Sequence, residues 1–144
     1  MTDSLGRIFS IAASGMNAQS VRLSTIASNL SNAGSSGTEA TAYHAKNVIF
    51  SEVKKSVSGL NPEDQFLGGV QVTGVVSSTK PLDKRYDPSN PSADENGNVY
   101  ATDVNPIEEM TNMIAASKEY EANVEVMNTA KTLMAQSINA LNTR

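Results

Sequence analysis

The fold is decided by residues 4–33, SLGRIFSIAASGMNAQSVRLSTIASNLSNA, which contain neither proline nor an acidic residue. Apolar residues recur here at alternating steps of four and three, with one polar member in the series: Leu5, Phe9, Ala12, Met16, Gln19, Leu23, Ile26, Leu30 and Ala33. A sustained seven-residue repeat is typical of a helix packed along a left-handed seam. The pattern predicts a helix of about 45 Å, ended by the Gly- and Ser-rich run 32–37.

A second long helix is predicted over residues 106–142. Pro106 suits a first helical turn, and Asn105 before it is a suitable N-cap. Glu108 and Glu109 fall near the positive end of the helix dipole. A three-and-four spacing follows, in which eight of ten residues are apolar: Met110, Met113, Ser117, Tyr120, Val124, Met127, Lys131, Met134, Ile138 and Leu141. The stripe is widened by further apolar residues, which indicates more than one neighbouring helix: Ile107, Ile114, Ala130 and Leu133.

Between the two helices the pattern changes to that of strands. Residues 47–57 and 70–79 are rich in Val, Ile and Thr, so they predict two strands that form a hairpin around the loop 59–69. The stretch 81–99 carries three of the chain's five prolines. It predicts an extended linker with little regular structure.

The predicted fold class is therefore mainly α with a small β part. The long terminal helices pair as a coiled-coil-like hairpin, and the β-hairpin and linker lie between them in the sequence. We expect one structural unit of three segments: an N-terminal axial helix over 1–33, a middle segment over 34–105 and a C-terminal axial helix over 106–144.

The composition indicates a chain with little core of its own. Apolar residues make up 39% and aromatic residues 5%, and there is no Trp. Such a chain has little stability to spare when alone, so partners are expected to complete its core. We hypothesise that both ends of the isolated monomer are largely disordered and become ordered on assembly.

Charge and patterning argue against several classes of partner. The net charge is −4 and the isoelectric point is near 4.9, which disfavours binding to nucleic acid or an anionic membrane surface. No apolar run approaches the length of a membrane span, and the N-terminus lacks the pattern of a cleavable signal peptide. Without cysteine the chain has no disulfide and no thiolate chemistry.

No combination of residues predicts catalysis. His44 is the single histidine, with no second His or Cys to complete a metal or nucleophilic site, so a structural or surface role is expected. Residues 94–97 lack the alternating oxygen ligands of a calcium loop and predict a solvated turn. Glu108-Glu109 and the pair Glu119 and Glu121 predict a solvated or inter-subunit polar face. We predict a non-enzyme without cofactor, metal or small-molecule substrate.

Six segments carry a family likeness: IAASGMNAQS over 11–20, ASNLSNA over 27–33, YHAKNVIF over 43–50, YDPSNPSADENG over 86–97, EEMTNMIAAS over 108–117 and YEANVEVMNTAK over 120–131. The first two resemble the N-terminal signature of bacterial flagellar rod and hook proteins. The later segments are similar to the proximal-rod member of that family. His44 departs mildly from the family, which often has Arg at that position.

The resemblance implies a structural subunit of the proximal rod of the flagellar basal body, the drive shaft that transmits torque. It implies export through the flagellar type III apparatus without a cleaved signal peptide, and helical assembly in the periplasm with copies of itself and other rod proteins. We expect the terminal helices to make the assembly contacts through these residues: Leu5, Phe9, Met16, Leu23, Ile26, Leu30, Met110, Met113, Tyr120, Val124, Met127, Met134, Ile138 and Leu141.

Two alternatives stay open at this point. One is another flagellar axial subunit, of the rod or the hook, that occupies a different position. The other is a regulatory or chaperone-like coiled-coil module that binds a partner's helix in the cytoplasm. The cellular location separates the two classes, because a rod subunit purifies with basal bodies.

Overall fold

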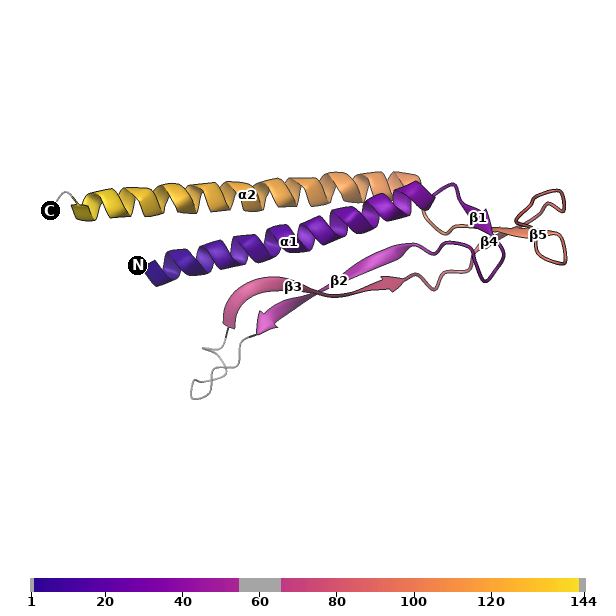
Figure 1. Cartoon of the computed structure of the whole chain (residues 1–144), viewed down its shortest axis with the longest axis horizontal. Helices are drawn as coiled ribbons and strands as arrows, with labels where there is room; N and C mark the ends of the chain where they lie inside the picture. Colours follow the sequence, from indigo (N-terminus) through magenta and orange to yellow (C-terminus); the bar gives the residue numbers. More distant parts are fainter. Residues whose placement is uncertain (1, 55–65, 143–144) are drawn as a thin grey trace. The chain divides into compact units, whose positions relative to one another are not determined.

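Along the sequence, all the β-strands of the described chain lie between two long helices. The computed structural model describes residues 2–54 and 66–142, and the side-chain surroundings of 5–53 and 68–140. The element order is α1 (Thr2–Asn32), β1 (Ser36–Gly37), β2 (Lys46–Lys54), β3 (Phe66–Ser77), β4 (Asp83–Tyr86), β5 (Asn98–Ala101) and α2 (Pro106–Asn142) (Figure 1). The predicted class, mainly α with a small β part, is confirmed. In the described part of the chain neither helix is apolar enough over a sufficient length to span a membrane.

The helix ends follow the residues expected to make them. Asn105 is the N-cap of α2, because its Oδ1 accepts the backbone N–H groups of Ile107 at 3.1 Å and Glu108 at 3.5 Å. At the end of α1, the carbonyl of Asn32 accepts the N–H of Ser35 at 3.0 Å and its hydroxyl at 2.8 Å. Local partners therefore satisfy some of the terminal backbone groups where α1 ends and where α2 begins.

The chain divides into two compact units, each of which holds a section of both helices and of the β2–β3 pair. Unit 1 comprises the described residues of 2–21, 50–73 and 116–142, and unit 2 comprises 22–49 and 74–115. Strands β2 and β3 pair with each other in a two-stranded sheet. Each unit is described in turn.

In unit 1 the two helices meet through small and polar side chains. Gly15 of α1 faces Asn123 of α2 so closely that a Cβ at Gly15 would lie 2.8 Å from Asn123 Oδ1. One turn further along, Gln19 Nε2 donates to Glu119 Oε2 at 2.7 Å. A step of four forward on α1 therefore matches a step of four back on α2, as in an antiparallel pair. Among the described side chains of this unit, the buried apolar residues are all alanines: Ala12, Ala18, Ala116 and Ala130.

The hydroxyl of Ser14 links strand β3 to α1 in unit 1. Ser14 Oγ donates to the carbonyl of Ile11 at 2.7 Å and accepts the backbone N–H of Val70 at 3.1 Å. Gly69, with φ of +123°, brings β3 this close, since a Cβ there would lie 3.1 Å from Ser14 Oγ. The predicted loop 59–69 was wrong at its end, because β3 begins at Phe66. Its remaining residues 59–65, and residues 55–57 of the first predicted strand, lie outside the described residues.

A three-stranded antiparallel sheet in unit 2 replaces part of the predicted linker. Its order is β1-β5-β4, with Gly37 opposite Tyr100 and Arg85 opposite Val99. The prediction of little regular structure over 81–99 was therefore wrong. The strands are short, and all four side chains of β4 are exposed, so no alternation of apolar and polar residues marks them. These strands form because their backbones pair with residues that are distant in the sequence.

The turn between β4 and β5 is held by Asp94, as expected of a solvated turn. Asp94 Oδ1 accepts the backbone N–H groups of Asn96 at 2.9 Å and Asn98 at 2.8 Å. The N–H of Asn98 is the largest influence holding the pKa of the Asp94 carboxyl below its ordinary value. Gly97 supplies the left-handed backbone that the turn requires, with φ of +75°.

The close approach at Gly15 makes a test of helix pairing in unit 1. Gly15→Ala places a methyl group against Asn123, whose own Nδ2 is held on the carbonyl of Glu119 at 2.9 Å. We expect this change to lower the free energy of unfolding by about 1 kcal/mol despite the better helix propensity of Ala. Urea denaturation followed by circular dichroism measures it.

Gly6→Ala on the same helix is the matched control, because a Cβ there meets nothing within 4 Å. It should raise the free energy of unfolding by about 0.5–1 kcal/mol. Equal effects of the two changes would contradict the close pairing at Gly15.

Candidate functional site

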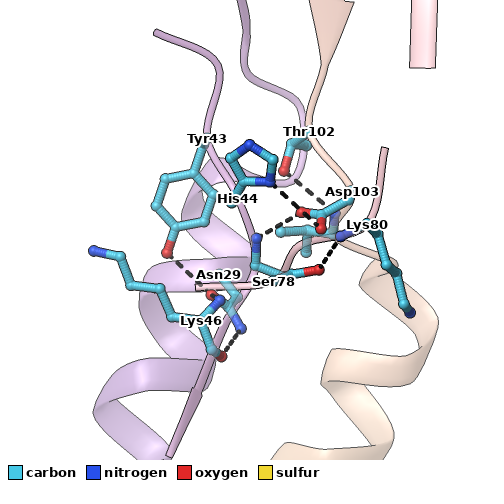
Figure 2. Close-up of polar contacts among 10 residues, drawn as sticks. Asn29, Tyr43, His44, Lys46, Ser78, Lys80, Thr102 and Asp103 are labelled. Carbon is cyan, nitrogen blue, oxygen red and sulfur yellow. Dashed lines mark hydrogen bonds and ion pairs between the residues drawn. The ribbon is translucent and has the colours of Figure 1, made fainter. Parts of the chain in front are cut away.

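The most fully bonded polar group of unit 2 is the amide of Asn29 on α1, which is 1% exposed. Its Nδ2 donates to the carbonyl of Lys46 at 2.8 Å and to Glu109 Oε2 at 3.0 Å. Its Oδ1 accepts the backbone N–H of Lys46 at 2.8 Å and the hydroxyl of Tyr43 at 3.0 Å (Figure 2). Two donors and two acceptor sites are the whole capacity of an amide. One side chain thus joins α1, the start of β2 and the first turn of α2.

Glu109 on α2 is buried as the partner of that amide, with 9% of its surface exposed. The predicted solvated or inter-subunit role was therefore wrong for Glu109. Glu119 is exposed, in keeping with the predicted solvated face, and it bonds Gln19 within unit 1. Burying a carboxylate is costly unless donors meet it, and here the Asn29 amide and the positive end of the α2 dipole do so. Sequence spacing could not identify this pair, because its members are eighty positions apart.

Tyr43 extends the cluster around Asn29. Besides donating to Asn29, its hydroxyl lies 3.1 Å from Ser28 Oγ. The ammonium group of Lys46 stands 5.4 Å from the centre of the Tyr43 ring, within the range of a cation–π contact. The segment that leads into β2 is thereby held against α1 by Ser28 as well as by Asn29.

A second polar centre of unit 2 forms around Asp103, in the segment between β5 and α2. Its side chain is 4% exposed, and its Oδ1 accepts the backbone N–H of Ala45 at 2.6 Å. Its Oδ2 lies 3.8 Å from His44 Nδ1 (Figure 2). Partial burial raises the pKa of the Asp103 carboxyl, but the side chain of Ser78, the Ala45 N–H and His44 together hold it below the ordinary value. His44 is thus placed in a structural cluster.

In the described part of the chain, no group of three or more His, Asp or Glu side chains lies close enough together to bind a metal ion. The two carboxylate oxygens of Asp94 face the turn, where Asn98 Nδ2 approaches each at 3.4 Å.

The fourteen residues predicted to make assembly contacts fall into three groups by exposure. Ile26 is buried. Met110, Tyr120 and Ile138 are exposed. The side chain of Leu141 lies outside the described residues, and the others are half-buried: Leu5, Phe9, Met16, Leu23, Leu30, Met113, Val124, Met127 and Met134. On α2 the most buried residues are Glu109, Ala116 and Ala130. Each stands one position before a member of the predicted series, namely Met110, Ser117 and Lys131.

An exposed apolar stripe lies on α2 in unit 2. Ile107 is 77% exposed, Met110 52% and Ile114 59%. At about 100° per residue these three side chains fall on one side of the helix, and Glu109, which bonds α1, falls on the opposite side. Three large apolar side chains on the face away from the chain's own helix partner are a surface suited to contact with another molecule.

The buried amide of Asn29 makes a second test. Asn29→Asp removes both donors and sets a second carboxylate beside Glu109. We expect it to lower the free energy of unfolding by about 2–4 kcal/mol, measured by urea denaturation. Adding Glu109→Gln should restore part of the loss.

The control is Asn17→Asp, the same chemical change at an exposed position of α1. It should stay within about 0.5 kcal/mol of the parent chain. A loss at position 17 as large as that at position 29 would show that the charge alone, and not the cluster, is responsible.

The lowered pKa of Asp103 gives an acid-dependence. A carboxyl whose pKa is lower in the folded state stabilises the fold while it is ionised. This contribution is complete above the ordinary value of 3.8 and declines as the pH falls from there through the lower folded-state pKa. Asp103→Asn should remove this part of the acid transition in thermal melts recorded between about pH 5 and pH 2.5. If the loss of stability at acid pH is the same in the variant as in the parent chain, Asp103 is not the group responsible.

Comparison with known proteins matches both ends of the chain and most of its length. Residues 9–37 match the family described as flagella basal body rod protein, and residues 95–141 match that described as flagellar basal body rod FlgEFG protein C-terminal. The flagellar basal-body rod protein FlgC of Buchnera aphidicola subsp. Schizaphis graminum is 42% identical over 139 residues, which cover 94% of this chain and 96% of that protein.

Two further relatives carry the same description. The FlgC protein of Salmonella typhimurium is 42% identical over 132 residues, which cover 91% of this chain and 93% of the relative. That of Aquifex aeolicus is 34% identical over 130 residues, which cover 90% and 92%.

Proposed function

Because the chain belongs to the FlgC family of flagellar basal-body rod proteins, it is a structural subunit of the proximal rod, and we propose that it polymerises through its terminal helices. In this proposal α1 and α2 pair within the subunit. Their outer faces then pack against the helices of neighbouring subunits to build the wall of the rod.

The observation that carries the proposal is the exposed stripe Ile107, Met110 and Ile114 on α2. Burying three large apolar side chains contributes about 1.5–3 kcal/mol each, a driving force that the free subunit leaves unused. A stripe on one subunit that meets a different surface on the next forms a heterologous contact. Such contacts continue into open helical arrays, the geometry that a drive shaft needs to transmit torque.

The β2–β3 pair exposes further apolar side chains, and these lie on both of its faces. In unit 2, Ile49 is 46% exposed, and Val75 and Val76 are 47% and 44% exposed. A two-stranded sheet is marginal by itself and gains stability when a neighbour covers it. We assign the hairpin and the segments that follow it to contacts with adjacent rod subunits.

Assembly in the basal body requires a route to it. The proposed route is export in an unfolded state through the flagellar type III apparatus, without a cleaved signal peptide. Among the residues with described side chains, the largest that is fully buried is an asparagine, so that part of the chain has a small core to disrupt before export. The same shortage of core suits a subunit that completes its folding on assembly.

The exposed stripe on α2 gives the test of assembly. Ile114→Asp places a charge that would have no partner inside a packed interface, at a position that is open in the single chain. We expect the variant to keep the parent's helix content but to be missing from purified basal bodies, with motility lost on soft agar. Leu30→Asp should also abolish incorporation, but Leu30 is half-buried, so that change also affects the fold.

Ala115→Asp is the control, because Ala115 is exposed and lies about 100° around the helix from Ile114. It should incorporate and support motility. A motile strain that carries Ile114→Asp at normal subunit levels would refute the proposed interface.

A further inference from the structure

His44 and Asp103 face each other in unit 2 without completing a hydrogen bond. His44 Nδ1 lies 3.8 Å from Asp103 Oδ2, beyond hydrogen-bond distance and within reach of an ion pair. Nδ1 is buried and has no hydrogen-bond partner. A neutral imidazole carries its one proton on either nitrogen and has no net charge to attract the carboxylate. The protonated ring has a donor on Nδ1 and a positive charge, both directed at Asp103.

The charges around His44 leave Asp103 as its decisive neighbour. A pocket of about 210 Å³ beside the imidazole is lined by Glu39, Lys80 and Tyr100 together with Pro81 and Leu82. Glu39 and Lys80 carry opposite charges, and Asp103 is the carboxylate within ion-pair distance of His44. Tyr100 stays neutral near pH 7, since burial first and the charge of Glu39 second raise the pKa of its hydroxyl.

The pair stands where three segments of unit 2 meet. Ala45, next to His44, donates its N–H to Asp103 Oδ1 at 2.6 Å and accepts the N–H of Ser78 through its carbonyl at 2.7 Å. Ala45 directly precedes β2, Ser78 directly follows β3, and Asp103 lies three residues before α2. A stronger bond between His44 and Asp103 therefore strengthens the junction of β2, β3 and α2.

We propose that His44 and Asp103 form a pH-dependent latch, in which protonation of the imidazole closes an ion pair that holds the start of β2 to the segment entering α2. The latch is separate from the assembly surface on α2 and does not depend on it. Histidine is the residue whose ordinary range of titration spans pH 5 to 8, and this chain has one. Asp103 remains ionised across that range.

The test is hydrogen exchange of the Ala45 amide, which donates directly to Asp103. Its protection factor is measured on the full chain at about pH 5.5 and about pH 7.5, on either side of the histidine range. We expect protection to be about two- to fivefold higher at the lower pH, the ratio that a partly exposed ion pair supports. The Val70 amide, bonded to Ser14 in unit 1, is the internal reference and should give a ratio near one.

Two variants at position 44 separate the latch from general effects of pH. His44→Gln is neutral at both pH values and should show equal protection of Ala45 at both. His44→Arg is charged at both and should show the higher protection at both. A pH-dependent ratio in His44→Gln equal to that of the parent would overturn the proposal. So would His44→Arg protection no higher than that of His44→Gln, or an Ala45 amide unprotected at both pH values in the parent chain.

Discussion

The buried amide of Asn29 is the interaction on which unit 2 depends. It meets a backbone donor and acceptor at Lys46, the hydroxyl of Tyr43 and the carboxylate of Glu109, so every hydrogen-bonding position is used. Without the amide, the buried carboxylate of Glu109 would lose its donor, which is the most costly of these losses. The hydrogen bonds of the Asn29 amide therefore hold α1, the start of β2 and the first turn of α2 together in this unit. Apolar packing contributes less here than in an ordinary domain.

Much of the architecture could be predicted because the information for it is local. The seven-residue repeat and the absence of proline identified α1, and Asn105 with Pro106 identified the first turn of α2. Strands β4 and β5 could not be predicted in this way. Their short sequences lack alternation, and the residues they pair with, such as Gly37 opposite Tyr100, are distant in the chain. Local periodicity carries no information about such pairing.

The candidate site was predictable only in part, for a related reason. Periodicity identifies apolar residues but not the molecule that covers them. Ile26 is buried inside the chain, whereas Met110 from the same kind of repeat is half exposed. The buried residues of α2 are instead Glu109, Ala116 and Ala130. Two alanines allow close approach of helices, and a carboxylate is accepted because Asn29 meets it. The larger apolar side chains of α2 are thereby left exposed or half-buried in the single chain.

The small size of the buried side chains has a thermodynamic consequence. The buried apolar residues of the described chain are four alanines, with Ile26, Val99 and Val104. Exposure of apolar surface is what gives unfolding its large positive heat capacity change, so a chain that buries so little has a shallow stability curve. In the assembly proposed above, further apolar surface is removed from water when subunits meet. Polymerisation would then carry the negative heat capacity change that folding carries in a compact domain. Temperature would act on the growth of the rod through that change.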